Sequence, residues 1–194
     1  MVDAALRRAV MAVALANLAY FFVEFAVARQ IGSVSLFADS VDFLEDTAIN
    51  LLIVLALGWP ARRRARLGMV LAAVLLVPAA AFLWTAWHKL AAPTAPDPWL
   101  LSLTGVGALI VNVGCATLLA RYRHESGSLT RAAFLSARND AVANIAIIAA
   151  GVVTLFWRSG WPDLVVGLGI AAMNADAAWS VWRAAKAEHA AAEP

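Results

Sequence analysis

Acidic side chains repeat at helical spacing inside one long apolar stretch of the sequence. Asp39, Asp42 and Asp46 follow an i, i+3, i+7 pattern, with Asn50 one turn further along. Residues at this spacing share one face of a helix, so the carboxylates would line one side of it. Neighbouring carboxylates repel strongly at low dielectric unless they are protonated or bridged by a cation. The pattern therefore predicts a proton-or-metal site, with Asp42 and Asp46 as two of its ligands.

A second group of oxygen donors occurs in another apolar stretch. Ser136, Asp140 and Asn144 lie at successive i+4 spacing, which again places them on one helical face. Hydroxyl, carboxylate and amide oxygens are ligands that hard and intermediate divalent cations accept. The two stripes together would supply about four ligands. The alternative for Asp140 is an ion pair with Arg138 or with a cation on another helix.

Other ionisable side chains in apolar stretches need a partner or a task, because each costs about 2.5–3.5 kcal/mol at bilayer depth. Asp39 has an alternative place near the start of its helix, hydrated or capping the first turn. Glu24 ends a further i, i+3, i+7 stripe with Asn17 and Tyr20. We interpret this stripe as hydrogen bonding between helices, with a proton path as the alternative.

The remaining charged and imidazole side chains have structural interpretations. Arg138 and Asp176 lie at similar distances from the same ends of their helices, so we expect a buried ion pair between them, with Glu45 as the competing partner. The histidines fall in loops, at helix ends or in the tail, and are predicted to be surface residues; they are His88, His124 and His189.

Membrane-spanning helices must position these groups. The chain has 194 residues, 63% of them hydrophobic and 14% charged, with a mean hydropathy of +0.77, so it is more apolar than a soluble core requires. A helix crosses a bilayer core of about 30 Å with about 20 residues. Apolar segments of about this length cover residues 9–28, 34–57, 67–90, 99–120, 130–156 and 163–183. The sequence predicts an all-α membrane protein with six transmembrane helices in residues 1–187, and a short disordered cytoplasmic tail over 188–194.

The basic residues indicate the orientation of the chain. One set of helix ends holds Arg7, Arg8, Arg62, Arg63, Arg64, Arg66, Arg121, Arg123, Arg131, Arg183 and Lys186, against Arg29, Lys89 and Arg158 at the other. Both termini are therefore predicted to be cytoplasmic, in a multi-pass protein of the inner (plasma) membrane. The net charge of only +2 does not indicate a nucleic-acid partner, and the sole cysteine, Cys115, excludes an internal disulfide.

The first apolar stretch has a competing interpretation as a signal peptide. Arg7, Arg8 and the small residues Ala26-Val27-Ala28 imitate its charged start and cleavage site. The stretch is longer than a typical signal core and contains Asn17 and Glu24, which a removable segment does not need. We expect the first helix to be retained.

Two stretches carry a resemblance to a known family. Residues 32–46 read Gly-Ser-Val-Ser-Leu-Phe-Ala-Asp-Ser-Val-Asp-Phe-Leu-Glu-Asp, and residues 136–144 read Ser-Ala-Arg-Asn-Asp-Ala-Val-Ala-Asn. They resemble the second-helix and fifth-helix His/Asp-x-x-x-Asp signatures of the cation diffusion facilitator family, whose six-helix domain exports divalent metals, generally in exchange for protons. The helix number, the cytoplasmic termini and Trp161-Pro162-Asp163 at the opening of the last helix also fit.

The resemblance implies a ligand set with one departure. Asp42, Asp46 and Asp140 correspond to three of the family's four transport-site ligands, and Ser136 takes the fourth place, which is usually His. Without imidazole the site is all oxygen, which weakens the case for zinc and leaves manganese, iron(II), cobalt or nickel. Asn144 is the candidate replacement ligand. The sequence ends soon after the last helix, so we expect the family's cytosolic metal-sensing and dimerising domain to be absent.

We therefore expect a metal/proton antiporter whose partners are divalent metal ions, protons and the lipid bilayer. A homodimer is also expected, and no cofactor, since the metal is cargo. One alternative is a membrane phosphotransferase with metal-binding aspartates, although no Asp-Gly-x-x-Ala-Arg-like element precedes the acids. The other is a non-transporting membrane scaffold subunit, in which polar stripes serve only helix association.

Overall fold

The computed structural model describes residues 4–56, 80–121 and 127–173, without the side chains of 53, 55–56 and 127–138. These ranges form helices and no strand, which confirms the all-α prediction. The helices are α1 (Ala4–Ile31), α2 (Val34–Ala56), a helix over residues 80–91, α4 (Pro98–Ala120), α5 (Gly127–Phe156) and Trp161–Met173. The rest of the predicted third and sixth segments and the predicted tail lie outside the described residues.

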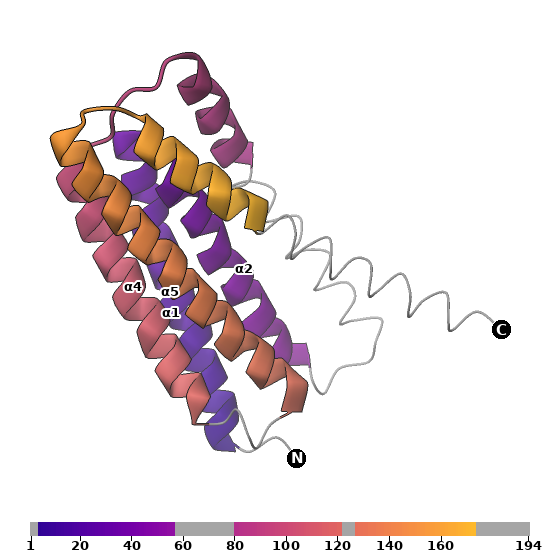
Figure 1. Cartoon of the computed structure of the whole chain (residues 1–194). Helices are drawn as coiled ribbons and strands as arrows, with labels where there is room; N and C mark the ends of the chain where they lie inside the picture. Colours follow the sequence, from indigo (N-terminus) through magenta and orange to yellow (C-terminus); the bar gives the residue numbers. More distant parts are fainter. Residues whose placement is uncertain (1–3, 57–79, 122–126, 174–194) are drawn as a thin grey trace.

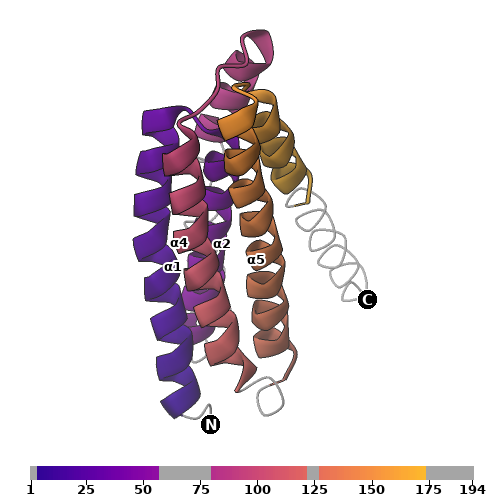
Figure 2. The ribbon, with the colours of Figure 1, turned by 60° about the vertical axis from the view of Figure 1, so that its left-hand side comes forward.

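Four long helices run side by side as a bundle (Figures 1 and 2). α1 packs along α2, α4 packs along α5, and α1 also contacts α4. α2 and α5, which carry the two polar stripes, belong to different pairs and contact each other less. The helix over residues 80–91 and the start of Trp161–Met173 lie at the end of the bundle where α1 passes into α2. We call this the outer end, because the basic residues predict that it faces away from the cytoplasm.

A tight turn joins α1 to α2 at the outer end. Gly32 has a φ of 63°, a left-handed conformation that glycine adopts without a side-chain clash. The backbone N–H of Ser33 donates to the carbonyl of Ala28 at 3.0 Å, which closes the last turn of α1 in the manner of a Schellman motif. The turn reverses the chain, so α1 and α2 are antiparallel neighbours.

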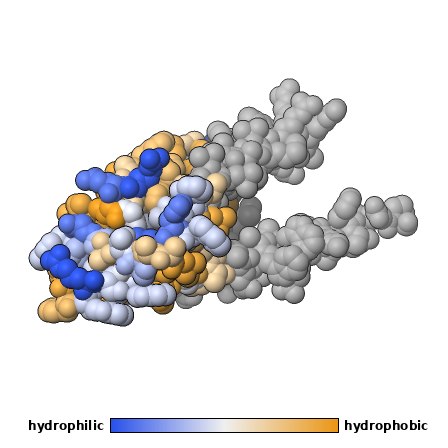
Figure 3. All heavy atoms as spheres, turned by 90° about the horizontal axis from the view of Figure 1, so that it is seen from above, coloured by the Kyte–Doolittle hydropathy of each residue, from blue (hydrophilic) through white to orange (hydrophobic). Residues whose placement is uncertain are grey.

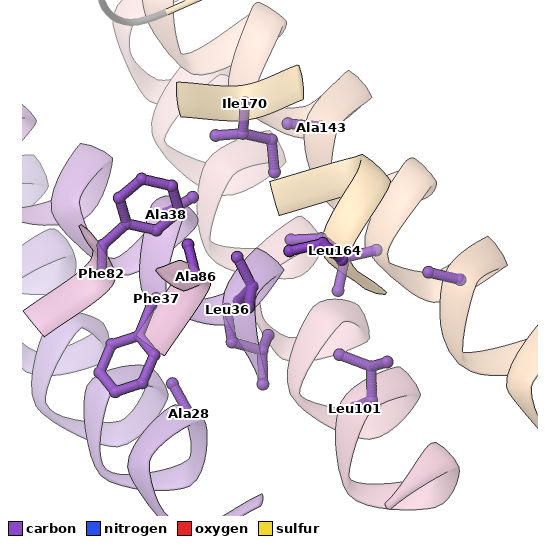
Figure 4. Packing of buried hydrophobic residues seen from close by; sticks show 13 residues of the cluster. Ala28, Leu36, Phe37, Ala38, Phe82, Ala86, Leu101, Ala143, Leu164 and Ile170 are labelled. Atoms are coloured by element: carbon purple, nitrogen blue, oxygen red, sulfur yellow. The ribbon is translucent and has the colours of Figure 1, made fainter. Parts of the chain in front are cut away.

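Apolar side chains fill the interior near the outer end and also cover the outside of the bundle. A cluster of buried residues that includes Leu36, Phe37, Leu101, Ile147 and Leu164 joins α2, α4, α5 and Trp161–Met173 (Figure 4). Large apolar side chains are also exposed along the helices, and polar side chains gather on the outer end face (Figure 3). An apolar exterior is what a lipid-facing surface requires.

Exposed tryptophans mark the outer end of the bundle. They are Trp84, Trp87, Trp99, Trp157 and Trp161, each near the end of its helix. Tryptophan is enriched where a helix meets the lipid headgroups, so this set marks the outer end as a membrane interface. Trp59, Trp179 and Trp182 lie outside the described residues.

Three of the described helices are long and apolar enough to cross a membrane: Ala4–Ile31, Pro98–Ala120 and Asn139–Phe156. α2 has 23 residues and is also long enough, but it carries four acidic side chains, at 39, 42, 45 and 46. These four acids distinguish α2 from the other three helices. A helix of this kind is stable in a membrane only if its acids face the interior of the protein.

Asp163 fixes the outer end of α2. Its fully buried carboxylate accepts hydrogen bonds from the backbone N–H groups of Val34 (2.9 Å) and Ser35 (3.1 Å) and from the hydroxyls of Ser33 (2.6 Å) and Ser35 (2.7 Å). Lys89, also buried, completes the set with an ion pair of 3.1 Å. A negative charge at a helix N-terminus is favoured by the helix dipole. Asp163 therefore caps α2 from another helix and ties it to the segment over residues 80–91.

Replacing Asp163 with Ala should destabilise the protein strongly, because it uncaps α2 and leaves the Lys89 charge buried without its partner. Breaking a buried pair in this way costs about 3–5 kcal/mol. We expect a large fall in the melting temperature of the detergent-purified chain. The control is Asp97→Ala, which removes the exposed side-chain cap of α4 and costs about 0.5–2 kcal/mol. Equal melting temperatures for the two variants would contradict the role of Asp163 as a clamp between α2 and the helix over residues 80–91.

Candidate metal site

The acidic stripe of α2 faces the inside of the bundle. Asp39 is fully buried, Asp46 is 9% exposed and Asp42 is partly buried. Asp140, on α5, is also partly buried. The helix runs without a break from Val34 to Ala56, so the predicted spacing does place the three α2 acids on neighbouring turns of one face. The bundle therefore encloses these carboxylates instead of presenting them to lipid.

Asp46 is oriented by α1 and α4. The side-chain amide of Asn17 donates to Asp46 Oδ2 at 3.4 Å, and the thiol of Cys115 donates to Asn17 Oδ1 at 3.6 Å. On α2 itself, the amide of Asn50 donates to the backbone carbonyl of Asp46 at 2.7 Å. Asn17 is fully buried. The stripe of α1 thus does form helix-to-helix hydrogen bonds, and one of them holds a predicted ligand.

Asn144 links α5 to Asp39. Its Nδ2 donates to Asp39 Oδ2 at 2.5 Å, and its Oδ1 accepts from Asn112 Nδ2, on α4, at 2.9 Å. All three side chains are buried. The amide of Asn144 therefore contacts the outermost acid of α2, and its role as a ligand beside Asp42 and Asp46 stays a prediction.

Glu24 brings a further carboxylate to this region. It is fully buried on α1, and its carboxyl group neighbours that of Asp39. One turn earlier, Tyr20 uses its hydroxyl to donate to the backbone carbonyl of Thr104, on α4, at 2.6 Å. Glu24 therefore faces the same interior as the acids of α2, although its distance from them along the chain gives no sign of this.

The other sequence predictions have mixed outcomes. Glu45 is partly buried, and His88 is exposed beside Trp84 at the outer end, as expected of a surface histidine. The side chains of Ser136 and Arg138, together with Asp176, His124 and His189, lie outside what the structure describes. The Arg138 ion pair and the Ser136 ligand therefore stay predictions. Among the described side chains, no three His, Cys, Asp or Glu residues converge in metal-binding geometry.

Sequence reasoning missed Asn112 and the clamp formed by Asp163. Asn112 is the only amide in the long apolar run of α4, and a lone buried amide in a membrane helix signals a contact with a neighbouring helix. Asp163 was noted only as part of a motif at the opening of the last helix. Neither residue belongs to a stripe of polar residues at helical spacing, so the periodicity of the sequence could not predict their contacts.

The described bundle of apolar helices encloses carboxylates of α1, α2 and α5, an arrangement that suits a membrane transporter for cations. The sequence matches the family model described as the cation efflux transmembrane domain over residues 10–187. The chain therefore belongs to the cation efflux, or cation diffusion facilitator, family. It is a multi-pass membrane protein and a transporter of divalent metal cations, not an enzyme, so the phosphotransferase alternative is excluded. No curated protein matches the sequence.

The contact between Asn17 and Asp46 generates a test. Replacing Asn17 with Leu removes a donor to Asp46, and the loss of such an orienting group lowers metal affinity about 10–100-fold. We expect weaker Mn²⁺ binding to the detergent-purified chain by calorimetry. The control is Asn50→Leu, which also removes a buried amide but one that bonds only the backbone of Asp46 among its observed hydrogen bonds. Equal losses of affinity in both variants would count against an orienting role for Asn17.

Proposed function

We propose that this protein exports divalent metal cations from the cytoplasm in exchange for protons. Asp42, Asp46 and Asp140 are the proposed carboxylate ligands, and Ser136 or Asn144 completes the shell. The observation that carries the proposal is the inward-facing acidic stripe of α2, with Asp46 buried and oriented by Asn17. Buried carboxylates repel each other at low dielectric, and a dication or protons relieve that repulsion.

Coupling to protons follows from the ligand chemistry. Carboxylates coordinate a metal in their ionised form, so metal binding expels protons and reprotonation favours metal release. A site that holds either a dication or protons, but not both, exchanges one for the other whenever it is exposed alternately to the two sides. The proton gradient across the inner (plasma) membrane would then drive export, with reprotonation from outside.

The packing of the bundle supports a moving site. The proposed ligands come from α2 and α5, which belong to the separate pairs α1–α2 and α4–α5. Contacts within each pair are more extensive than those between α2 and α5. Rocking of one pair against the other would bring the ligands together and expose them to either side in turn.

The ligand types bear on the choice of metal. The proposed set contains carboxylate, hydroxyl and amide oxygens and no imidazole, which suits manganese, iron(II), cobalt or nickel better than zinc. We also propose a homodimer.

Asp46 is the most direct test of transport. In proteoliposomes with an imposed pH gradient, the wild-type chain should take up Mn²⁺ and Co²⁺, with Zn²⁺ as a comparison, and Asp46→Ala should lose this uptake. The control is Asp97→Asn, which changes an exposed acid while keeping a good helix cap for α4. If Asp46→Ala transports as well as the wild type, the site assignment is wrong.

Asp42 provides a test of binding without transport. Metal that binds the folded state stabilises it by about 2.7 kcal/mol at a hundredfold excess over Kd. Mn²⁺ should therefore raise the melting temperature of the wild-type chain, and Asp42→Asn should reduce that rise, because it removes a charged ligand but keeps the shape. An undiminished rise in Asp42→Asn would place the bound metal elsewhere.

A further inference from the structure

Glu24 and Asp39 form a pair of buried carboxyl groups outside the proposed transport ligands. Glu24 comes from α1 and Asp39 from α2, helices that pack along each other (Figure 2). Neither side chain has any exposed surface. Their carboxyl groups are neighbours, so two acid groups meet in the interior of a membrane protein.

Three of the four oxygens in this pair lack a hydrogen-bond donor among the described residues. They are both oxygens of Glu24 and Oδ1 of Asp39; Oδ2 of Asp39 accepts from Asn144. A buried polar atom without a partner is rare in folded proteins and calls for an explanation such as an ion. Two ionised carboxylates cannot satisfy each other, because neither of them donates, and a proton shared between the two groups is the alternative to a cation. A cation between them would satisfy all three oxygens.

The side chain of Asn144 can act as a ligand for such a cation. Its amide is held between Asp39 and Asn112, donating to the first and accepting from the second. Asn112 can reverse roles with it, because an amide carries a donor and an acceptor at similar positions. Rotation of the Asn144 and Asn112 amides by half a turn would direct Asn144 Oδ1 towards the pair and keep the bond to Asn112. Asn144 would then be a neutral oxygen ligand.

The pair lies on the outer side of the proposed transport ligands. Glu24 is seven residues before the end of α1 at Ile31, and Asp39 is five residues after the start of α2 at Val34. At a rise of about 1.5 Å per residue, Asp39 is about 4.5 Å nearer the outer end than Asp42 along the helix axis. A cation that moves outward from Asp46 and Asp42 meets Asp39 next.

We propose that Glu24, Asp39 and Asn144 form a second binding site for the transported divalent cation, on its outward path. This inference rests on the proposed export function. A dication balances both carboxylate charges, whereas a single shared proton leaves one negative charge buried. The site is all oxygen, like the proposed transport ligands, so it accepts the same class of metal. Two protons, one on each acid, are the rival occupant.

Metal stoichiometry tests the second site. We would measure Mn²⁺ bound at saturation to the full chain in detergent, by equilibrium dialysis and metal analysis. The wild type should bind about two Mn²⁺ per chain, and Glu24→Gln and Asp46→Ala about one each, as expected for separate sites on the folded state. The double variant Glu24→Gln/Asp46→Ala should bind none. Glu45→Gln, which removes a partly buried acid of α2 outside both sets, should retain the wild-type stoichiometry.

The outcomes separate the two proposals. If the wild type and Glu24→Gln bind the same amount of Mn²⁺, the pair holds protons and the second site is overturned, even where Asp46→Ala abolishes transport. If Glu24→Gln loses one equivalent while Asp46→Ala loses none, the second site stands and the transport ligands are wrong. Should Glu24→Gln not fold, Asp39→Asn decides in the same way, since it removes the other charge and keeps the shape.

Discussion

Burying a carboxylate away from water costs free energy unless its oxygens find donors, and this constraint governs the structure. The described acids differ in how many of their oxygens have a donor. Asp163 has its oxygens filled by backbone N–H groups, two hydroxyls and Lys89. Asp39 has a donor on one oxygen, and Glu24 has none among the described residues. A fully satisfied carboxylate is a fixed structural element. In the proposals above, the carboxylates with unfilled oxygens are the ones that take a cation.

Asp163 determines where the acids of α2 lie in the bundle. Asp163 holds the first turn of α2, and the helix then extends inward from that point with Asp39, Asp42 and Asp46 on successive turns. Because Lys89 shares the same carboxylate, α2, the helix over residues 80–91 and Trp161–Met173 are joined at their outer ends. A rearrangement that exposes the acids to the outside must move these three segments together or break the buried ion pair between Lys89 and Asp163. Breaking a buried ion pair costs a large amount of free energy.

Hydropathy and spacing predicted the helices and the inward-facing stripe well, but not the contacts between helices. The segment over 99–120 corresponds to Pro98–Ala120, since length and charged ends bound an apolar helix closely. The partners of the acids escaped prediction because they are far apart in the chain. Asn17 and Asp46 are 29 residues apart, and Ser33 and Asp163 are 130 residues apart. Spacing reports the face of one helix, and only tertiary packing brings two faces together.

The polar contacts also explain how the bundle is specified. Lipid tails are as apolar as leucine, so apolar burial alone does not choose which helix faces touch, and interhelical hydrogen bonds contribute to that choice. Here α1 reaches α2 through Asn17, α5 reaches α2 through Asn144, and α4 reaches α5 through Asn112. Two of these bonds end on acids of the α2 stripe. In the proposed function, a cation that neutralises those acids would weaken the bonds that hold the helices in this arrangement. Under this proposal, cation occupancy and helix arrangement are thermodynamically linked, which is the requirement for a transporter whose cargo drives its own conformational change.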